Sequence, residues 1–286
     1  MIEIPESYTL AKQLNETIRG KTVQTVSAGH TSHRFTFFLG NPQDYPGLLE
    51  GKTIDQTEAV AGQVELSMGD ARLVFNDGTN LRYLEKGEKR PQKHQFLMEL
   101  EEGSALACTV QMYGGIYGFL EGGNDSPYYL AAKEKPSPLS AAFDPAYFEA
   151  LWEQAKPTLS VKAFLAAEQR IPGLGNGALQ DILFQARINP KTKISEIRLE
   201  EKENLYKSVK ETLKAMADGG GRDTEKDLFG SPGGYETILS KNTWQRGCPR
   251  CGGPIVRTAF LGGNVYYCPV CQPLGLLPGH GNGGDD

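Results

Sequence analysis

The alternation of apolar and polar positions divides the chain into a strand-rich first half and a helical second half. Residues 5–19 follow a helical pattern, because Leu10, Leu14 and Ile18 recur every four positions. From there to about residue 130, the period of two that is typical of strands takes over. We therefore expect an antiparallel β-sandwich with one N-terminal helix packed on it.

Two β-hairpins are predicted within the sandwich, because alternating segments flank short turns that contain glycine. The first joins residues 72–75 to 79–83 through Asn76-Asp77-Gly78, and the second joins 95–100 to 105–112 through residues 101–103. Cys108 falls within the second hairpin, where a buried core thiol is expected rather than a reactive one.

Linkers rich in glycine and proline, at 122–127 and 135–138, separate the sandwich from a segment with helical periodicity. Four helices are expected there, at residues 147–155, 161–167, 177–186 and 199–217. The predicted division is an N-terminal domain at 1–130, a helical domain at 131–240, a cysteine-rich module at 241–273 and a disordered tail at 274–286. His280, in that tail, is not expected to be a ligand.

Length and charge set loose limits on function. A chain of 286 residues can form two ordinary domains and a small module. No segment is apolar enough to span a membrane, and residues 1–6 lack the pattern of a signal peptide, so the predicted compartment is the cytoplasm. A net charge of −5 argues against a generally basic nucleic-acid binder, although association depends on local patches of charge.

Four cysteines near the C-terminus form two C-x-x-C pairs, Cys248 with Cys251 and Cys268 with Cys271. Their spacing is typical of a zinc ribbon, in which two tight turns aim four thiolates at one tetrahedral Zn²⁺ ion. Disulfide bonding is the alternative use of such pairs. Four thiolate ligands leave no position open for water, so a zinc ion here is predicted to be structural.

The same module carries unopposed positive charge. It has no Asp or Glu between residues 241 and 272, where Arg246, Arg250 and Arg257 lie. A metal-stapled hairpin with free cations suits the phosphate backbone of a nucleic acid. Many zinc ribbons instead bind proteins or only hold a fold, so these alternatives stay open at this point.

A second glycine-rich segment, residues 171–177 (Ile-Pro-Gly-Leu-Gly-Asn-Gly), precedes the helical pattern at 178–186. Glycines let the backbone approach another chain closely, and exposed amides at a helix N-terminus favour an anion. Taken alone, the segment is equally compatible with an ordinary turn.

Together and in this order, the motifs resemble the Fpg/Nei family of DNA glycosylases, the formamidopyrimidine-DNA glycosylase and endonuclease VIII group. The resemblance runs from Met1 to Gln272. It rests on Glu3-Ile4-Pro5-Glu6, Pro172-Gly173-Leu174-Gly175-Asn176, Gly220-Gly221, Pro232-Gly233-Gly234-Tyr235 and Tyr267-Cys268-Pro269-Val270-Cys271-Gln272.

The resemblance implies an α+β fold with an N-terminal β-sandwich, a helical domain that contains a helix–two-turn–helix, and a zinc-ribbon hairpin. It further implies a monomeric, nucleoid-associated base-excision repair protein that binds double-stranded DNA with a damaged or abasic site and flips the damaged nucleotide. Asn176, with Gly175 beside it, matches a phosphate contact. The loop at 221–235 matches one near the flipped base, with Arg222 as a candidate DNA contact and a solvated loop as the alternative reading.

The catalytic positions depart from the family pattern. The family's nucleophile is an N-terminal proline, whose amine attacks the sugar C1′, forms a Schiff base and cuts the strand by β-elimination. Ile2 holds that position here, and isoleucine is too bulky for normal removal of the initiator, so Met1 is expected to stay. Glu3 matches the adjacent acid. The family's lysine aligns with Gln63, and its zinc-hairpin arginine aligns with Gly263 or Asn264.

Three functions therefore stay open. The first is a DNA glycosylase and AP lyase that uses the primary amine of Met1 or Ile2 beside Glu3, because an α-amine titrates near ~7.7–8.0 and is partly neutral at physiological pH. The second is a non-catalytic protein that binds damaged or branched DNA. The third is a nucleic-acid scaffold unrelated to damage, with RNA as a possible ligand class.

Other polar and aromatic residues have simpler expected roles. His30 and His33 are expected in a turn rather than as a metal pair. The loop with Lys86, Lys89, Arg90 and Lys93 is expected to be a solvated face, with contact to phosphate as the alternative. Core packing is expected for Tyr128-Tyr129 and for Met112-Tyr113, with a wedge into DNA as the alternative.

Overall fold

The computed structural model describes residues 1–275 and divides the chain into two compact units. Unit 1 comprises residues 1–137 and 214–236, and unit 2 comprises residues 138–213 together with the chain from 237 onward. Among the described residues, no helix combines the length and apolar character needed to cross a bilayer. The domain boundaries expected from the sequence remain predictions, and the expected tail, including His280, lies almost wholly outside the described residues.

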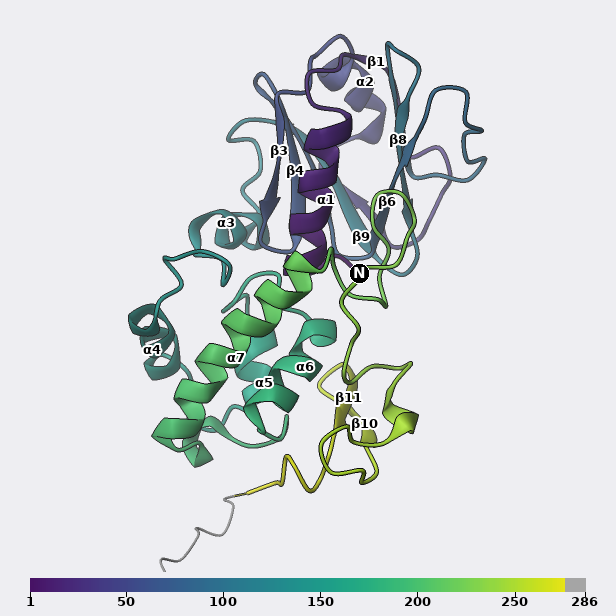
Figure 1. The fold of residues 1–286 in the computed structure, drawn as a ribbon. Helices are drawn as coiled ribbons and strands as arrows, with labels where there is room; N and C mark the ends of the chain where they lie inside the picture. Colours follow the sequence, from purple (N-terminus) through teal and green to yellow (C-terminus); the bar gives the residue numbers. More distant parts are fainter. Residues whose placement is uncertain (276–286) are drawn as a thin grey trace, which may run out of the picture. The chain divides into compact units, whose positions relative to one another are not determined.

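Unit 1 is a sandwich of two sheets (Figure 1). One sheet has the order β1-β7-β8-β6, with β1 at Val23–Ala28, β7 at Phe96–Leu100, β8 at Ala105–Val110 and β6 at Thr79–Leu84. The other has the order β2-β9-β5-β4-β3, with β2 at Thr36–Phe38, β9 at Gly114–Leu120, β5 at Ala71–Asn76, β4 at Gln63–Met68 and β3 at Gln56–Val60. The α+β class is confirmed.

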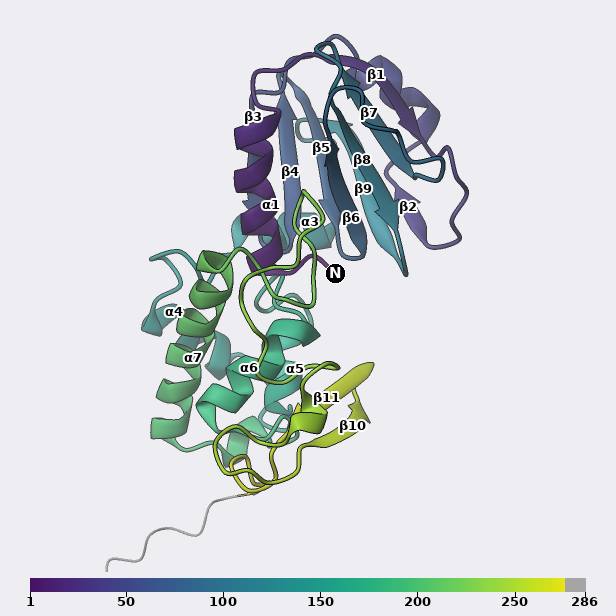
Figure 2. The same ribbon diagram turned by 45° about the vertical axis from the view of Figure 1, so that its right-hand side comes forward.

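Helix α1 (Ile4–Thr17) confirms the predicted N-terminal helix and runs beside β3 and β4 (Figure 2). Glu3 is its N-cap, and the Glu6 carboxylate accepts a hydrogen bond from the Glu3 N–H at 3.1 Å, which closes a capping box. Leu10 and Leu14 on its inner face are buried in the core between the sheets. The first turn of α1 is therefore fixed by both capping and packing.

The hairpin predicted around Asn76-Asp77-Gly78 is wrong. Strand β5 pairs with β4 and β9, whereas β6 pairs with β8 in the opposite sheet, so this turn carries the chain from one sheet to the other. Asp77 adopts a left-handed φ of 47°, and the Gly78 N–H donates to the Tyr113 carbonyl at 2.9 Å. A turn of asparagine, aspartate and glycine supplies this backbone conformation equally well for a hairpin or a crossover.

Two other expectations about the sheets have different outcomes. The second hairpin is confirmed, since β7 and β8 pair antiparallel on either side of residues 101–103. The sandwich is not wholly antiparallel, because β2 pairs parallel with β9. The chain reaches this short edge strand from β1, which lies in the other sheet, so β2 is not joined to its partner β9 by a hairpin turn. The expected core position of Cys108 is also confirmed.

Three short helices complete the elements around the sandwich: η1 (Pro42–Asp44), α2 (Tyr45–Leu49) and α3 (Pro127–Glu134). The third was not predicted, because its sequence lies between two linker-like segments. Residues 219–236 also belong to unit 1 and reach the sandwich beside β6 (Figures 1 and 2). Leu228 is fully buried in the sandwich core, and its carbonyl accepts from the Tyr83 N–H at 3.0 Å. This loop is thus part of the sandwich's hydrogen-bonded structure.

Unit 2 combines helices with a small hairpin. Its elements are α4 (Pro145–Glu153), α5 (Val161–Ala166), α6 (Asn176–Ala186), η2 (Ile194–Glu196), most of α7 (Leu199–Asp218), η3 (Trp244–Arg246) and the antiparallel strands β10 (Val256–Phe260) and β11 (Gly263–Tyr267). The four predicted helices are confirmed. Phe143, Phe148 and Phe164 pack through a series of edge-on ring contacts that join α4 to α5.

Candidate active site and zinc hairpin

The first two residues of the chain are held by a hydrogen bond and an ion pair. The Ile2 N–H donates to the Asp77 carbonyl at 2.7 Å, and the Ile2 side chain is 6% exposed within the sandwich core. The free α-amine therefore belongs to Met1, which forms an ion pair with the Glu225 carboxylate from the loop after α7. Ile2 anchors the N-terminus, whereas Met1 carries the α-amine.

Glu3 and Glu6 share one buried arginine. Arg222 Nη1 lies 3.1 Å from Glu3 Oε1, and its Nη2 lies 2.7 Å from Glu6 Oε2. The Arg222 Nε and backbone N–H also donate to Glu6 Oε1, at 2.9 and 3.1 Å. Because all three side chains are at least 95% removed from solvent, these charges depend on one another for compensation.

The titration behaviour of the group follows from this arrangement. Burial by itself would raise the pKa of Glu6, but attraction to Arg222 and its hydrogen bonds prevail and lower that pKa. Burial would lower the pKa of Arg222, and the charges of Glu3 and Glu6 raise it instead. The sequence-based prediction that Arg222 contacts DNA does not fit this position, because its guanidinium is enclosed and its donors face two carboxylates.

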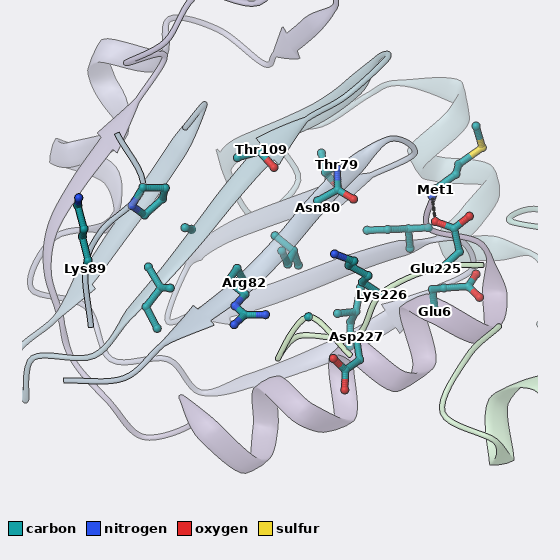
Figure 3. A pocket seen from close by; sticks show the side chains of 17 residues that line it. Met1, Glu6, Thr79, Asn80, Arg82, Lys89, Thr109, Glu225, Lys226 and Asp227 are labelled. Carbon is teal, nitrogen blue, oxygen red and sulfur yellow. Dashed lines mark hydrogen bonds and ion pairs between the residues drawn. The ribbon is translucent and has the colours of Figure 1, made fainter. Parts of the chain in front are cut away.

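A pocket of about 340 Å³ opens beside the N-terminus in unit 1. Met1 and Glu225 lie at one end of it and Lys89 at the other, with Asn80 and Arg82 of β6 along its wall (Figure 3). Its volume falls in the range of small-molecule sites, and its wall mixes apolar, hydrogen-bonding and charged groups. The α-amine thus faces a cavity large enough for a small polar ligand.

Asp77 lies in the turn after β5, where its carbonyl accepts from the Ile2 N–H. Its half-buried side chain accepts a hydrogen bond from the Tyr128 hydroxyl at 3.3 Å. Burial raises the pKa of Asp77, against the opposing effects of Tyr128 and of the positive N-terminus. Burial and the negative charges of Asp77 and Glu3 raise the pKa of Tyr113. Sequence reasoning missed Asp77 because its residue type and neighbours indicated only a turn.

Gln63 occupies the position aligned with the family's lysine. It lies at the start of β4, opposite Asn76 of β5, and is 1% exposed. Within the described residues, neither atom of its side-chain amide has a hydrogen-bond partner. The amide is neutral and lies in a buried place, where an unpaired charge would be costly.

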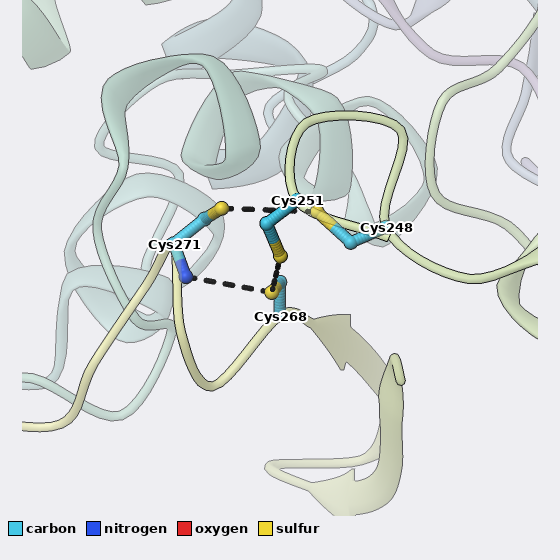
Figure 4. A group of neighbouring side chains, drawn as sticks. All are labelled: Cys248, Cys251, Cys268 and Cys271. Carbon is cyan, nitrogen blue, oxygen red and sulfur yellow. Dashed lines mark hydrogen bonds between the residues drawn. The ribbon is translucent and has the colours of Figure 1, made fainter. Parts of the chain in front are cut away.

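The four predicted metal ligands converge in unit 2 (Figure 4). Their sulfur atoms all lie within 4.8 Å of one another, with Cys248 Sγ 3.8 Å from Cys271 Sγ and Cys251 Sγ 3.5 Å from Cys268 Sγ. A tetrahedral zinc ion with bonds of ~2.3 Å to sulfur needs sulfur–sulfur separations of about 3.8 Å. The thiols fit zinc, and the structural zinc site is confirmed.

The zinc hairpin packs on α6 through Asn176. Asn176 Nδ2 and Gln180 Nε2 both donate to the Asn264 carbonyl, at 2.9 and 3.2 Å, and Gln180 Oε1 accepts from the Tyr266 N–H. A side chain at Gly263 would meet the Asn176 amide, because an added Cβ would lie 3.3 Å from its nitrogen. The glycine-rich turn and the hairpin tip are therefore fitted to each other.

The other predicted DNA contacts stand in three different settings. Gly175 is the N-cap of α6. Arg250 donates to the Phe184 carbonyl at 2.8 Å and lies over the Phe184 ring, so it holds the end of α6. Arg246 and Arg257 are exposed, with Arg257 over the Trp244 ring. For these residues the DNA contact remains a prediction.

Two lysines at the hairpin tip were missed by sequence reasoning. Lys162 of α5 is 4% exposed and donates to the Phe260 carbonyl at 2.6 Å, and its burial lowers the pKa of its amine. Lys191 lies over the Phe260 ring. No local pattern distinguishes them from other lysines, because only the packing of α5 against the hairpin brings them together.

The remaining expectations have mixed outcomes. His30 stacks on His94 at 4.5 Å, and the cysteines are the only cluster of three or more potential ligands found in residues 1–275. Tyr129 is buried and donates to Glu65, in agreement with core packing. Core packing is wrong for Met112 and Tyr113, which are 66% and 42% exposed.

Two protein-family models match the chain. The model of the formamidopyrimidine-DNA glycosylase H2TH domain matches residues 135–226, and the model of a zinc finger found in FPG and IleRS matches residues 248–274. Formamidopyrimidine-DNA glycosylase of Shouchella clausii is 28% identical over 283 residues, which cover 96% of this chain and 99% of the relative. That of Thermus thermophilus is 28% identical over 294 residues, which cover 96% and 100%.

Solved structures agree with these matches along nearly the whole chain. The MutM (Fpg) protein from Thermus thermophilus has a TM-score of 0.78 at 25% identity and covers 96% of this chain and 100% of its own. Lactococcus lactis Fpg in complex with DNA containing an abasic site has a TM-score of 0.81 at 25% identity and covers 95% and 99%. By domain content, zinc site and full-length likeness, the resemblance of the chain to the Fpg/Nei family of DNA glycosylases is confirmed.

Proposed function

We propose that this protein binds damaged double-stranded DNA and cleaves it at abasic sites through the α-amine of Met1. The observation that carries the proposal is the position of that amine on a pocket of about 340 Å³, two residues before the buried Glu3. An amine beside carboxylates in a sheltered pocket can form an imine with the aldehyde of an opened sugar. This arrangement retains the family's type of chemistry although Ile2 replaces its proline.

The proposed steps follow from that chemistry. The neutral amine attacks C1′, which expels a damaged base or, at an abasic site, releases water and leaves an imine. Removal of a proton from C2′ then expels the 3′ phosphate and cuts the strand. Glu3 is proposed to act on the opened sugar, with Arg222 fixing the direction of its carboxylate. The nucleotide is proposed to reach the pocket by flipping out of the duplex.

DNA binding is proposed to involve the zinc hairpin and α6 of unit 2. Asn176 lies in the first turn of α6, where backbone amides favour a phosphate, and it touches the hairpin tip. Exposed Arg246 and Arg257 add positive charge on the hairpin module. The relative from Lactococcus lactis was solved with abasic DNA, which supports the choice of ligand.

A second candidate is a protein that binds damaged DNA without cutting it. The contact between the Met1 amine and Glu225 favours it, because that contact holds the amine against a carboxylate instead of leaving it free to attack a sugar. Gln63, in place of a lysine, points in the same direction.

Borohydride trapping on an oligonucleotide with one abasic site distinguishes the two candidates. The expected result is a covalent adduct that peptide mapping places on Met1, with strand cleavage in the absence of borohydride. N-terminal acetylation should abolish the adduct while leaving affinity for a tetrahydrofuran abasic analogue unchanged. Tight, selective binding of the analogue with no adduct would establish the binding protein instead.

A further inference from the structure

A hollow of about 640 Å³, which we call the β2 hollow, lies at one edge of the five-stranded sheet in unit 1. Strand β2 is the edge strand there and runs beside β9 (Figure 2). The lining residues are His33, Phe35, Phe37, Gln111, Met112 and Tyr113. Phenylalanine is among the side chains most often buried, yet Phe35 is 47% and Phe37 52% exposed. An exposed apolar patch of this kind indicates a binding surface.

The register of β2 explains why these rings stay uncovered. Phe38 packs against the core between the sheets, so Phe37, its neighbour in the strand, points to the outer face. The partner of Phe37 in the ladder is Gly115, which has no side chain to lie against the ring. Helix α3 covers another part of this face, where the rings of Tyr129 and Phe119 lie 5.4 Å apart. The open end of the face therefore follows from the strand pairing.

The surroundings of the β2 hollow favour a negatively charged ligand. The guanidinium of Arg34 lies 5.2 Å from the centre of the Phe35 ring, and His33 meets the same ring edge-on. Of the described residues that line the hollow, none is acidic. The sequence has no Asp or Glu at 17–43 or 103–120, although the whole chain has a net charge of −5. Aromatic rings beside cations suit unpaired nucleobases, which stack on the rings while the cations attract their phosphates.

The β2 hollow is linked to the N-terminal site by one peptide group. The carbonyl of Asp77 accepts from the Ile2 N–H at 2.7 Å, and the N–H of Gly78 in the same peptide group donates to the Tyr113 carbonyl at 2.9 Å. The Tyr113 carbonyl is therefore within about 8 Å of the Ile2 nitrogen. At a rise of ~3.4 Å per nucleotide, a strand covers that distance in two or three nucleotides. One strand can thus contact both places.

We propose that the β2 hollow holds unpaired nucleobases that flank the abasic nucleotide, with Phe35 and Phe37 as the stacking surfaces. The preferred substrate is then duplex DNA in which the bases around the lesion are already separated. This inference rests on the proposed function, because it takes DNA as the ligand of unit 1. It can be tested separately, since stacking on β2 needs neither the Met1 amine nor strand cleavage.

Fluorescence anisotropy with two labelled duplexes tests the proposal. Both contain one tetrahydrofuran abasic analogue, which is flanked by paired bases in the first duplex and by mismatched bases on both sides in the second. The variants Phe35→Leu and Phe37→Leu keep an apolar side chain but remove the ring, whereas Phe37→Trp keeps a ring. Leu120→Ala is the matched control, because Leu120 is also exposed and lies at the other end of β9.

The wild type should bind the mismatched duplex ~10-fold more tightly than the paired one, which is the scale of stacking one base on an aromatic side chain. Phe35→Leu and Phe37→Leu should each remove most of this preference while changing affinity for the paired duplex less than about twofold. Phe37→Trp should keep the preference, and Leu120→Ala should behave as the wild type. The fluorescent base 2-aminopurine, placed beside the analogue, should be quenched by the wild type and not by Phe37→Leu.

Equal binding of the two duplexes by the wild type would overturn the proposal, and so would equal losses on both duplexes in Phe37→Leu. Sedimentation provides a further check. A wild type that dimerises without DNA, together with a monomeric Phe37→Leu, would overturn the proposal by showing that the hollow is an interface between copies of this chain.

Borohydride trapping on abasic DNA separates this proposal from the lyase proposal. A preference for the mismatched duplex that depends on the rings, without any adduct on Met1, would show that the lyase proposal fails while the role of the β2 hollow stands. An adduct on Met1 without such a preference would show the reverse.

Discussion

The guanidinium of Arg222 lies 2.7 Å from the carboxylate of Glu6, and both side chains are buried at the first turn of α1. This contact joins the loop after α7 to the helix that positions the N-terminus. Because Glu3 shares the same guanidinium, one arginine compensates two buried negative charges.

Replacement of Arg222 by methionine should therefore destabilise unit 1 strongly. Removing one partner from a buried ionic group costs ~3–5 kcal/mol, because the remaining charges stay buried without compensation. Urea unfolding followed by the circular dichroism of the sandwich measures the loss. Arg198→Met is the matched control, since Arg198 forms only an exposed pair with Glu201. If the triple change Arg222→Met, Glu3→Gln, Glu6→Gln were no more stable than Arg222→Met alone, the electrostatic explanation would fail.

The lowered pKa of Glu6 predicts loss of stability in acid. A carboxyl whose pKa is lower in the folded state binds fewer protons there, so its contribution is complete above its unfolded pKa of ~4.3 and is lost as the pH falls through its folded value. The melting temperature should thus fall more steeply below about pH 4.3 in the wild type than in Glu6→Gln. Parallel pH curves for the two proteins would contradict this assignment.

Replacement of Glu225 by glutamine should speed the reaction of the Met1 amine with aldehydes a few-fold at pH 7. The amine donates a hydrogen bond to the Glu225 carboxylate and must leave this contact before it can attack, and partly exposed pairs of this kind have modest energies. The rate at which glyceraldehyde with cyanoborohydride labels Met1, followed by peptide mass mapping, measures the effect. Glu121→Gln is a suitable control, since Glu121 is an exposed partner of Arg72. A slower rate in Glu225→Gln would show that Glu225 assists the reaction of the amine.

Removal of the zinc ion should affect the two units differently. Because four thiolates hold the hairpin, Cys271→Ser or strong chelation should unfold β10 and β11 and abolish DNA binding. Glyceraldehyde labelling of Met1 should be unchanged, since Met1 lies in unit 1. Elemental analysis should find one zinc per chain in the untreated protein. Loss of labelling on chelation would show that the N-terminal site depends on the zinc hairpin.

Asn176→Ala should weaken binding of the abasic analogue without changing the N-terminal reaction. Asn176 bonds to the Asn264 carbonyl, so its loss removes both a hairpin contact and the proposed phosphate contact. Gln180→Ala separates these roles, because Gln180 bonds to the same carbonyl from farther along α6. Fluorescence anisotropy should show the larger loss for Asn176→Ala. Equal losses would mean that hairpin packing alone explains the effect.

Local signals in the sequence were sufficient for the elements of the fold and for the zinc site. Cysteine spacing predicts the metal because ligand geometry is set within two short turns, and four-residue periodicity predicts α1 because its buried face is continuous. The same local reasoning failed at Asn76-Asp77-Gly78. A turn sequence specifies its own backbone conformation, but it does not specify which strand the next segment will pair with.

By itself, the sequence determined the N-terminal helix, the second hairpin of the sandwich, the four main helices that follow it and the zinc ligands. Only the tertiary structure decided which charged groups pair with one another near the N-terminus. Arg222 is 219 residues from Glu3 in the chain. The sequence predicted a DNA contact for Arg222, whereas this long-range contact makes it a buried counter-ion. The Asp77 carbonyl likewise meets the Ile2 N–H because of the sheet crossover. Pairings between distant residues depend on packing of the whole unit, and no local pattern encodes them.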